Sequence, residues 1–214
     1  MDTLRRFDYR IFLDVNSFAR HTGWLHGAVT DYAAYGVVLF ALLLGAGILL
    51  ARRGSDRALA AAGWAPIAML LAVAVNQPIG SWIAEARPYA SHPHLLVLAT
   101  RTSDFSFPSD HAVMAGAAAT GLLIASRRLG GIVAALALLM AGSRIYIAAH
   151  YPWDVVAGLL LGAGVSILGW VVLGPVLVTA TGWLRGQPPL RAVFGERAAQ
   201  TRSRSVTSPP AADI

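Results

Sequence analysis

The sequence of 214 residues contains no cysteine and no lysine, and only 13% of its residues are charged. The absence of cysteine excludes disulfide bonds and thiolate metal sites. The absence of lysine means that all 17 basic residues are arginine. A typical soluble domain carries about 25% charged residues, whereas this chain is 56% hydrophobic. The composition is therefore typical of an integral membrane protein.

Long apolar stretches predict helices that cross a bilayer. A hydrocarbon core about 30 Å thick requires roughly 20 apolar residues in a helix. Four stretches come close to this length: residues 30–51, 58–77, 131–149 and 154–174. A fifth, residues 109–126, is shorter and begins with polar residues, but its glycines and alanines favour close packing against other helices. We therefore expect an all-α polytopic membrane helix bundle of about five transmembrane helices.

The N-terminal segment has a different pattern. Its apolar residues recur every three or four positions from Phe7 to Phe18, while Asp14 and Arg20 interrupt any spanning run. This pattern predicts an amphipathic helix at the membrane interface; a sixth crossing over residues 7–29 is the alternative, which would bury Asp14 and Arg20 at high cost. We expect residues 1–184 to form one membrane domain and residues 185–214 to form a polar, disordered cytoplasmic tail.

The arginines are distributed unevenly among the connections. Ten of them would lie on one side of the membrane: Arg52, Arg53, Arg57, Arg127, Arg128, Arg185, Arg191, Arg197, Arg202 and Arg204. The loop 78–108 on the other side carries only Arg87 and Arg101. The positive-inside rule places the first group in the cytoplasm and this loop outside, although an odd number of spans also places the N-terminal arginines outside. Arginines that flank apolar runs indicate lipid headgroups as partners and argue against nucleic acid.

Three polar segments lie at the outer ends of the predicted spans, around Arg87, at residues 107–111 and at residues 143–154. Ionisable residues at membrane depth are costly and usually functional. The third predicted span begins at the outer face, the fourth ends there and the fifth begins there. The three segments are therefore expected to converge on a single site.

The residue types in these segments suit phosphate chemistry. Arg87 and Arg144 offer guanidinium forks for phosphate oxygens, and the helix start at Ser109 offers backbone amides to an anion. A histidine such as His150, oriented by a carboxylate such as Asp154, is a candidate nucleophile. Each residue alone also has a structural explanation, because interfacial arginines extend to water and Ser or Asp cap helices. The joint spacing favours the catalytic interpretation.

The spacing resembles that of the type 2 phosphatidic acid phosphatase superfamily. Its motifs are matched by Arg87-Pro88, by Pro108-Ser109-Asp110-His111, and by Ser143-Arg144 followed by His150 and Asp154. The resemblance covers residues 87–154 and is greatest for bacterial undecaprenyl-diphosphatase-like members. It implies that His150 is the nucleophile, with Asp154 orienting it and His111 as the acid and base. It also implies phosphate binding by Arg87, Ser109, Asp110, Ser143 and Arg144.

One position departs from that family. The family lysine would fall at Gly80, and no lysine elsewhere can replace it. Two alternatives follow: Arg101 of the loop substitutes for it, or the site operates with less positive charge. A site with less positive charge tolerates a diphosphate better than a phosphate monoester, because the diphosphate expels a more stable leaving group. We therefore expect hydrolysis of a polyprenyl diphosphate, such as undecaprenyl or decaprenyl diphosphate, at the outer face of the inner (plasma) membrane.

Several other functions remain alternatives. The same site would suit phosphatidic acid or phosphatidylglycerol phosphate, and a lipid transporter or lipid-binding protein would also use membrane arginines, without needing two histidines. Haloperoxidases share the phosphate motifs, but five apolar spans argue against a soluble oxidase. His92 and His94 form a weak zinc pattern without a nearby carboxylate cluster. We expect no metal and no cofactor.

Overall fold

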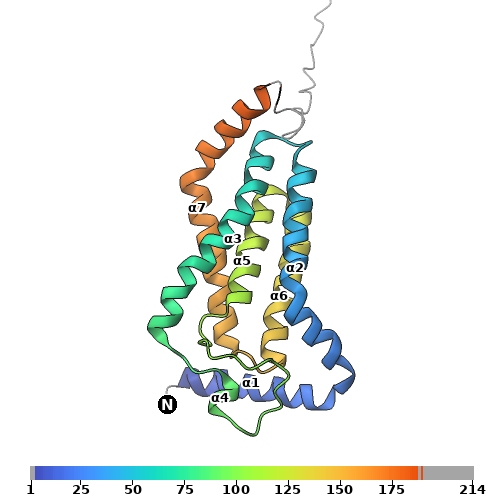
Figure 1. Cartoon of the computed structure of the whole chain (residues 1–214), viewed down its shortest axis with the longest axis vertical. Coiled ribbons are helices and arrows are strands. Elements are labelled where there is room, and N and C mark those ends of the chain that lie inside the picture. Colours follow the sequence, from blue (N-terminus) through green and yellow to red (C-terminus); the bar gives the residue numbers. More distant parts are fainter. Residues whose placement is uncertain (1–2, 188, 190–214) are drawn as a thin grey trace, which may run out of the picture.

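The computed structural model describes residues 3–187 and residue 189, and every regular element in this part is helical. Long helices form an upright bundle, and the N-terminal helix lies across one end of it (Figure 1). The elements are α1 (Thr3–His21), the 3-10 helix η1 (Gly23–Leu25), α2 (His26–Ala51), α3 (Asp56–Ile83), α4 (Pro88–Ser91), α5 (Asp110–Ala125), α6 (Arg127–Tyr146) and α7 (Pro152–Gly186). The prediction of an all-α membrane bundle is confirmed.

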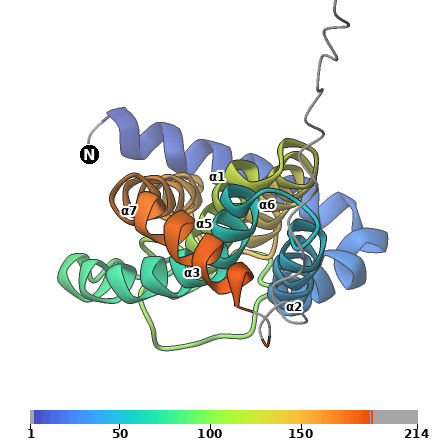
Figure 2. The same ribbon diagram turned by 90° about the horizontal axis from the view of Figure 1, so that it is seen from above.

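The shortest bundle helix, α5, occupies the middle of the bundle (Figure 2). Its 16 residues reach only about 24 Å, whereas the segments containing α2, α3, α6 and α7 are long and apolar enough to cross a membrane. α5 contacts all four of these helices, so protein surrounds it on its sides. Its Gly116 lies against α7, where an added Cβ would be 2.4 Å from the carbonyl oxygen of Leu159. Small residues thus allow backbone-to-backbone packing at the centre.

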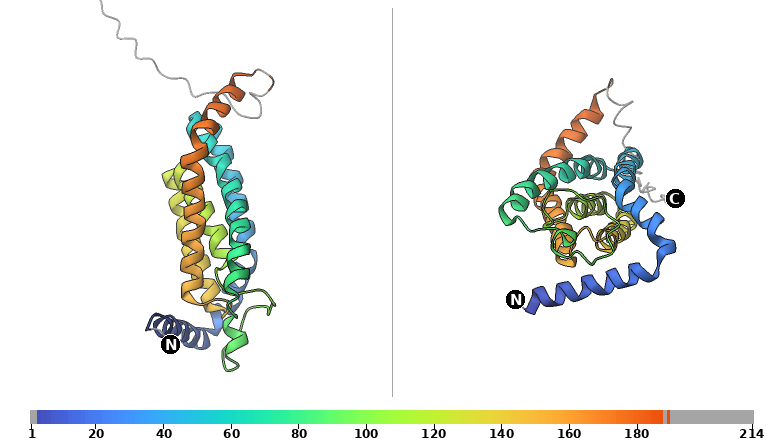
Figure 3. Two further views of the ribbon diagram at one scale, coloured as in Figure 1. Left: turned by 90° about the vertical axis from the view of Figure 1, so that its left-hand side faces the viewer. Right: turned by 60° about the horizontal axis from the view of Figure 1, so that its bottom comes forward.

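Helix α1 lies across the end of the bundle at which α3 and α6 end and α5 and α7 begin (Figure 3). On its inner face Phe12 and Asn16 are buried, and the Asn16 side chain donates to the Leu96 carbonyl at 2.7 Å and accepts from the Leu96 amide at 3.2 Å. On its outer face Leu4 and Phe7 are exposed. The predicted interfacial amphipathic helix is confirmed, and the alternative sixth crossing is wrong because α1 does not enter the bundle.

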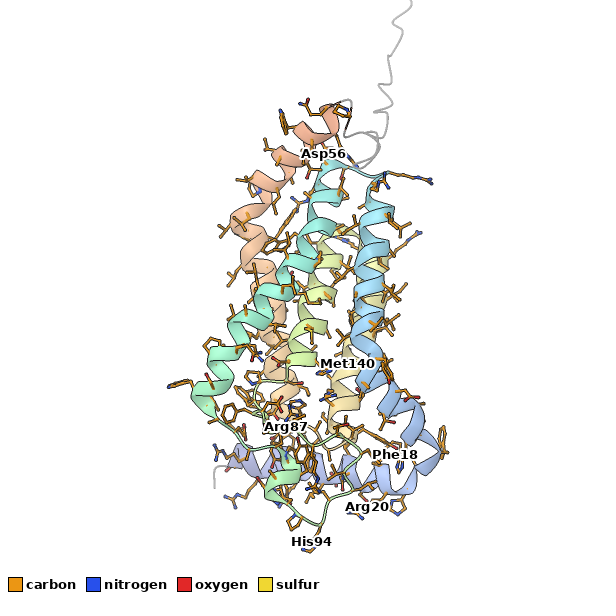
Figure 4. The ribbon with its side chains drawn as sticks, viewed as in Figure 1. Phe18, Arg20, Asp56, Arg87, His94 and Met140 are labelled. Atoms are coloured by element: carbon orange, nitrogen blue, oxygen red, sulfur yellow. The ribbon has the colours of Figure 1, made fainter. Side chains whose placement is uncertain are left out.

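The opposite end of the bundle is closed by Arg185. Its guanidinium donates to the Asp56 carboxylate at 2.9 Å and to the backbone carbonyls of Gly54 and Arg52 at 2.9 and 2.7 Å; Figure 4 labels Asp56 there, far from Arg87. Arg185 is buried and belongs to α7, so the expectation that the tail begins at this residue needs correction: the helix continues to Gly186. The rest of the predicted tail, residues 188 and 190–214, lies outside the described residues.

Candidate active site

The three polar segments meet at the α1 end of the bundle. Arg87 precedes α4, Ser109 and His111 lie at the start of α5, and His150 lies between α6 and α7. Figure 4 labels Arg87 at this end, where the loops join the bundle helices. The Nη1 atom of Arg87 is 3.1 Å from Nε2 of His150. The structure therefore brings together an arginine and a histidine that are 63 residues apart in the sequence.

A sharp turn after α6 places His150. The helix ends at Tyr146, and Ala148 adopts the left-handed conformation with φ of 61°, which is uncommon for a residue other than glycine. The turn allows the amides of Ala149 and His150 to donate to the Arg144 carbonyl, at 3.1 and 3.3 Å. His150 is only 2% exposed as a result.

The hydrogen bonds of His150 define its tautomer. Nδ1 lies 2.7 Å from the carbonyl oxygen of Ser106, and because a carbonyl only accepts, Nδ1 carries the proton. Nε2 faces the Arg87 guanidinium, which only donates, so Nε2 presents its lone pair. Burial, with the charges of Arg87 and Arg144, holds the pKa of His150 well below its ordinary value of 6.5. A neutral imidazole with an unprotonated Nε2 is the form that a nucleophile requires.

Asp154 reaches His150 mainly through Ser106. Its Oδ2 is 3.6 Å from Nδ1 of His150, which is beyond hydrogen-bonding distance. The same oxygen accepts from the Ser106 hydroxyl at 2.5 Å and from the Tyr151 amide at 2.8 Å. The resemblance implied a direct orienting contact between Asp154 and His150; here the carboxylate holds Ser106, whose carbonyl holds the imidazole. Ser106 was not among the predicted site residues.

Two buried polar atoms of predicted phosphate ligands have no hydrogen-bond partner among the described residues: Oγ of Ser109 and Nε of Arg144. Ser109 is fully buried and its amide donates to the Asp154 carbonyl at 3.1 Å. Arg144 donates through Nη1 to the Ala33 carbonyl of α2 at 3.3 Å. Unpaired buried donors are costly, and an anion with several acceptor oxygens satisfies them. These two atoms are the best evidence for an anion site.

Two other predicted ligands have different contacts. The Asp110 carboxylate accepts from the side-chain amides of Asn76 at 2.7 Å and Gln77 at 3.1 Å, and so ties α5 to α3. The Ser143 hydroxyl donates to the Met140 carbonyl of its own helix at 2.7 Å. The side chains of Asp110 and Ser143 therefore have structural partners, and their assignment as phosphate ligands stays a prediction.

His111 lies half-buried in the first turn of α5, where the charges of Arg144 and Arg87 act on its ring. This position is compatible with its predicted role as acid and base. His92, of the weak zinc pattern, packs its ring against that of Tyr9 with centroids 4.6 Å apart.

Asp104 is a second residue that the sequence did not reveal. Its carboxylate accepts two parallel hydrogen bonds from Arg87, from Nε at 3.2 Å and from Nη2 at 2.9 Å. Burial alone would raise the pKa of Asp104, but hydrogen bonds from Thr102 and Arg87 and the charge of Arg87 outweigh it, so the pKa lies below its ordinary value. Asp104 is therefore ionised at neutral pH.

Gly80, at the position of the family lysine, lies in α3 against the loop that leads to α5. A Cβ added there would be 3.3 Å from the Phe107 carbonyl oxygen, with no other contact within 4 Å. A side chain at this position would thus start beside the loop that carries Ser106 and Ser109.

Comparisons with known proteins agree with this geometry. The family model described as PAP2 superfamily matches residues 61–176, which include every segment of the site. The chain is 31% identical over 162 residues to undecaprenyl-diphosphatase BcrC of Bacillus subtilis, covering 75% of this chain and 81% of that protein. It is 38% identical over 131 residues to decaprenylphosphoryl-5-phosphoribose phosphatase of Mycobacterium tuberculosis, covering 61% and 68%. Among solved structures, Aquifex aeolicus LpxE superposes with a TM-score of 0.61 at 26% identity, covering 76% of this chain and 94% of that one.

Proposed function

The chain belongs to the PAP2 superfamily and is a multi-pass membrane phosphatase, and from this premise we propose that it hydrolyses a polyprenyl diphosphate, such as undecaprenyl or decaprenyl diphosphate, to the monophosphate. The observation that carries the proposal is the pairing of His150 Nε2 with Arg87 at 3.1 Å, together with the unpaired donors of Ser109 and Arg144 at the same end of the bundle. This arrangement offers a nucleophile and an anion site in the same place.

We propose a reaction in two steps. The lone pair of His150 Nε2 attacks the terminal phosphorus, and the bond from phosphorus to the bridging oxygen breaks as the Nε2–phosphorus bond forms. His111 protonates the leaving polyprenyl phosphate, and the positive charge on the imidazole is shared with the Ser106 carbonyl and the nearby Asp154 carboxylate. His111 then takes a proton from a water molecule whose oxygen attacks the phosphorus. The Nε2–phosphorus bond breaks as this bond forms, which regenerates neutral His150 and releases inorganic phosphate.

The positive charge available at the site supports a diphosphate substrate. Asp104 offsets the charge of Arg87, and Gly80 supplies none. Stabilisation of the transferring oxygens is therefore weaker than it would be with an additional cation, and a diphosphate, whose leaving group is a phosphate monoester, tolerates this better than an alkyl phosphate. The name of the Bacillus subtilis relative gives the same substrate class.

A phosphate ester on a polyprenyl-linked sugar is a second candidate substrate. It is favoured by the Mycobacterium tuberculosis relative, whose name specifies decaprenylphosphoryl-5-phosphoribose. A substrate panel separates the two candidates.

The decisive experiment measures phosphate release by the purified protein in detergent with a chelator present. Substrates are undecaprenyl diphosphate, a polyprenyl-linked sugar phosphate, phosphatidic acid and phosphatidylglycerol phosphate. We expect the wild type to hydrolyse the diphosphate fastest and His150→Ala to be inactive with all four. Activity that survives this substitution, or that depends on a divalent metal, contradicts the mechanism; a faster rate with another lipid contradicts only the substrate.

We further propose that the protein lies in the inner (plasma) membrane with its site on the extracytoplasmic side, which the arginine-rich connections at the other end of the bundle support. Since the chain has no cysteine, single-cysteine variants report on sidedness directly. Ser17→Cys lies on exposed α1 at the site end, and Gly186→Cys lies at the other end, where a Cβ meets nothing within 4 Å. A membrane-impermeant maleimide should label only Ser17→Cys in intact cells, or in spheroplasts where an outer membrane is present. Labelling of Gly186→Cys alone would contradict the proposed orientation.

A further inference from the structure

We propose that Asp104 is a positioning residue that fixes the guanidinium of Arg87 against the nucleophile, a proposal that rests on the phosphatase function above. The Asp104 carboxylate accepts hydrogen bonds from Arg87 and Thr102, so it reaches the nucleophile through Arg87 rather than by a hydrogen bond of its own.

Asp104 occupies one whole edge of Arg87. Nε and Nη2 donate to its two carboxylate oxygens at 3.2 and 2.9 Å. The Arg87 side chain is 9% exposed and that of Asp104 is 58% exposed. A carboxylate that faces solvent thus reaches a guanidinium that is almost completely buried, in the two-bond geometry that fixes orientation as well as distance.

The remaining edge of Arg87 faces the reacting groups. Nη1 donates to the Ala149 carbonyl at 3.0 Å and lies 3.1 Å from Nε2 of His150. Because a guanidinium is planar and rigid, a carboxylate that holds Nε and Nη2 also determines where Nη1 points. When phosphorus approaches Nε2, the N–H of Nη1 that now meets the imidazole is placed to meet a phosphoryl oxygen.

The loop before α5 supplies the partners of both residues. Asp104 holds Arg87, and Ser106, two positions later, holds Nδ1 of His150. The loop is itself fastened: the Thr102 amide donates to the Tyr89 hydroxyl at 3.0 Å, and the Thr102 hydroxyl donates to Asp104. One short segment therefore sets the relative placement of the arginine and the nucleophile.

Asp104 could instead compete with phosphate for Arg87, and the two roles predict opposite effects of removing its charge. If the carboxylate merely competes with phosphate for Arg87, removing its charge strengthens phosphate binding and raises activity. If Asp104 positions Arg87, removing its charge loosens Nη1 and lowers the rate of the chemical step, with little effect on ground-state binding.

The test is a double-mutant cycle with Asp104→Asn and Arg87→Lys, assayed on undecaprenyl diphosphate and on whichever panel lipid the wild type hydrolyses fastest. We expect Asp104→Asn to lower kcat by about 10- to 100-fold with KM nearly unchanged, as for loss of an orienting partner. In the Arg87→Lys background, where no fork remains to be held, the same change should alter kcat by less than about twofold. Asp14→Asn, which neutralises an exposed carboxylate of α1 at the same end, should behave as the wild type.

Asp104→Glu provides a second, less disruptive variant, since it keeps the charge but displaces the fork; we expect a kcat between those of the wild type and Asp104→Asn. Three results would overturn the proposal. The first is a rise in activity, or in affinity for the phosphate analogue vanadate, in Asp104→Asn. The others are a wild-type kcat in Asp104→Asn, and an equal effect of Asp104→Asn on kcat in the wild-type and Arg87→Lys backgrounds. If Asp104→Asn does not fold, a wild-type kcat in Asp104→Glu overturns it. A wild type that releases phosphate from no lipid refutes the proposed function instead.

Discussion

Helices α5 and α7 pack so closely that one added methyl group should disturb the site. At Gly162 of α7, an added Cβ would lie 2.1 Å from the Val113 carbonyl oxygen and 2.7 Å from the Ala117 amide nitrogen. Both contacts are with backbone atoms of α5, so no side-chain rotation relieves them. Gly162→Ala therefore forces the two helices apart.

The size of the effect follows from these distances. To restore ordinary van der Waals contact, the helices must separate by about 1 Å, and overpacking of this kind costs roughly 1–3 kcal/mol of stability. α5 carries Ser109 and His111, whereas α7 carries Asp154, so the separation also changes the geometry of the site. A misplacement of about 1 Å can lower the rate about 100-fold.

The assay compares thermal unfolding in detergent and kcat/KM for Gly162→Ala and Gly164→Ala. Gly164 lies two residues further along the same helix, and a Cβ there meets nothing within 4 Å, so this control should match the wild type in both measurements. Gly162→Ala should unfold at a lower temperature and lose most of its activity. Wild-type stability and activity in Gly162→Ala would refute the claim that this contact sets the spacing of the catalytic groups.

Three further predictions concern the site itself. Burial and nearby arginine charge hold the pKa of His150 well below 6.5, so the unfolded chain takes up a proton there as the pH falls through about 6.5 while the folded chain does not. The free energy of unfolding should therefore decrease below this pH, and it should decrease less in His150→Asn. An equal decrease in the wild type and His150→Asn would contradict this prediction. Ser106→Ala keeps the carbonyl that holds His150 but removes the hydroxyl bonded to Asp154, and should lower kcat about 10-fold; an unchanged kcat would show that Asp154 acts without Ser106. Gly80→Lys and Gly80→Ala both place a Cβ 3.3 Å from the Phe107 carbonyl oxygen, so the difference in rate between the two variants isolates the effect of the added charge. The lysine should raise the rate of hydrolysis of a phosphate monoester more than that of a diphosphate. Equal increases for both substrates would count against the proposed preference.

The fold was predictable from the sequence because the bilayer imposes a simple requirement of length and polarity on its helices. Even the short helix α5 was predicted, since its small residues indicated close packing. The end of α7 was placed too early because Arg185 reads as a tail residue, although its charge is buried against Asp56 and backbone carbonyls. Hydropathy does not distinguish an arginine that closes a helix end from one that faces solvent.

The site was predictable only where side chains act through recognisable spacing. Arg87 and His150 meet as the motifs suggest. Ser106 holds His150 through its backbone carbonyl, which every residue possesses, so no residue type signals this role. Asp104 lies in an irregular loop whose path depends on tertiary contacts, and Ser143 turns its hydroxyl to its own helix. Local pattern specifies the elements, whereas the loop between them decides which atoms face one another.

The position of α1 has a practical consequence for reconstitution. α1 and the proposed catalytic groups lie at one end of the bundle, while the end of α7 lies at the other (Figure 3). In vesicles of mixed orientation, an epitope placed ahead of α1 is exposed only on molecules whose proposed catalytic groups lie on the side of the bulk solution. Counting those epitopes measures the fraction of catalytic sites that added substrate can reach, and turnover can then be expressed per accessible molecule.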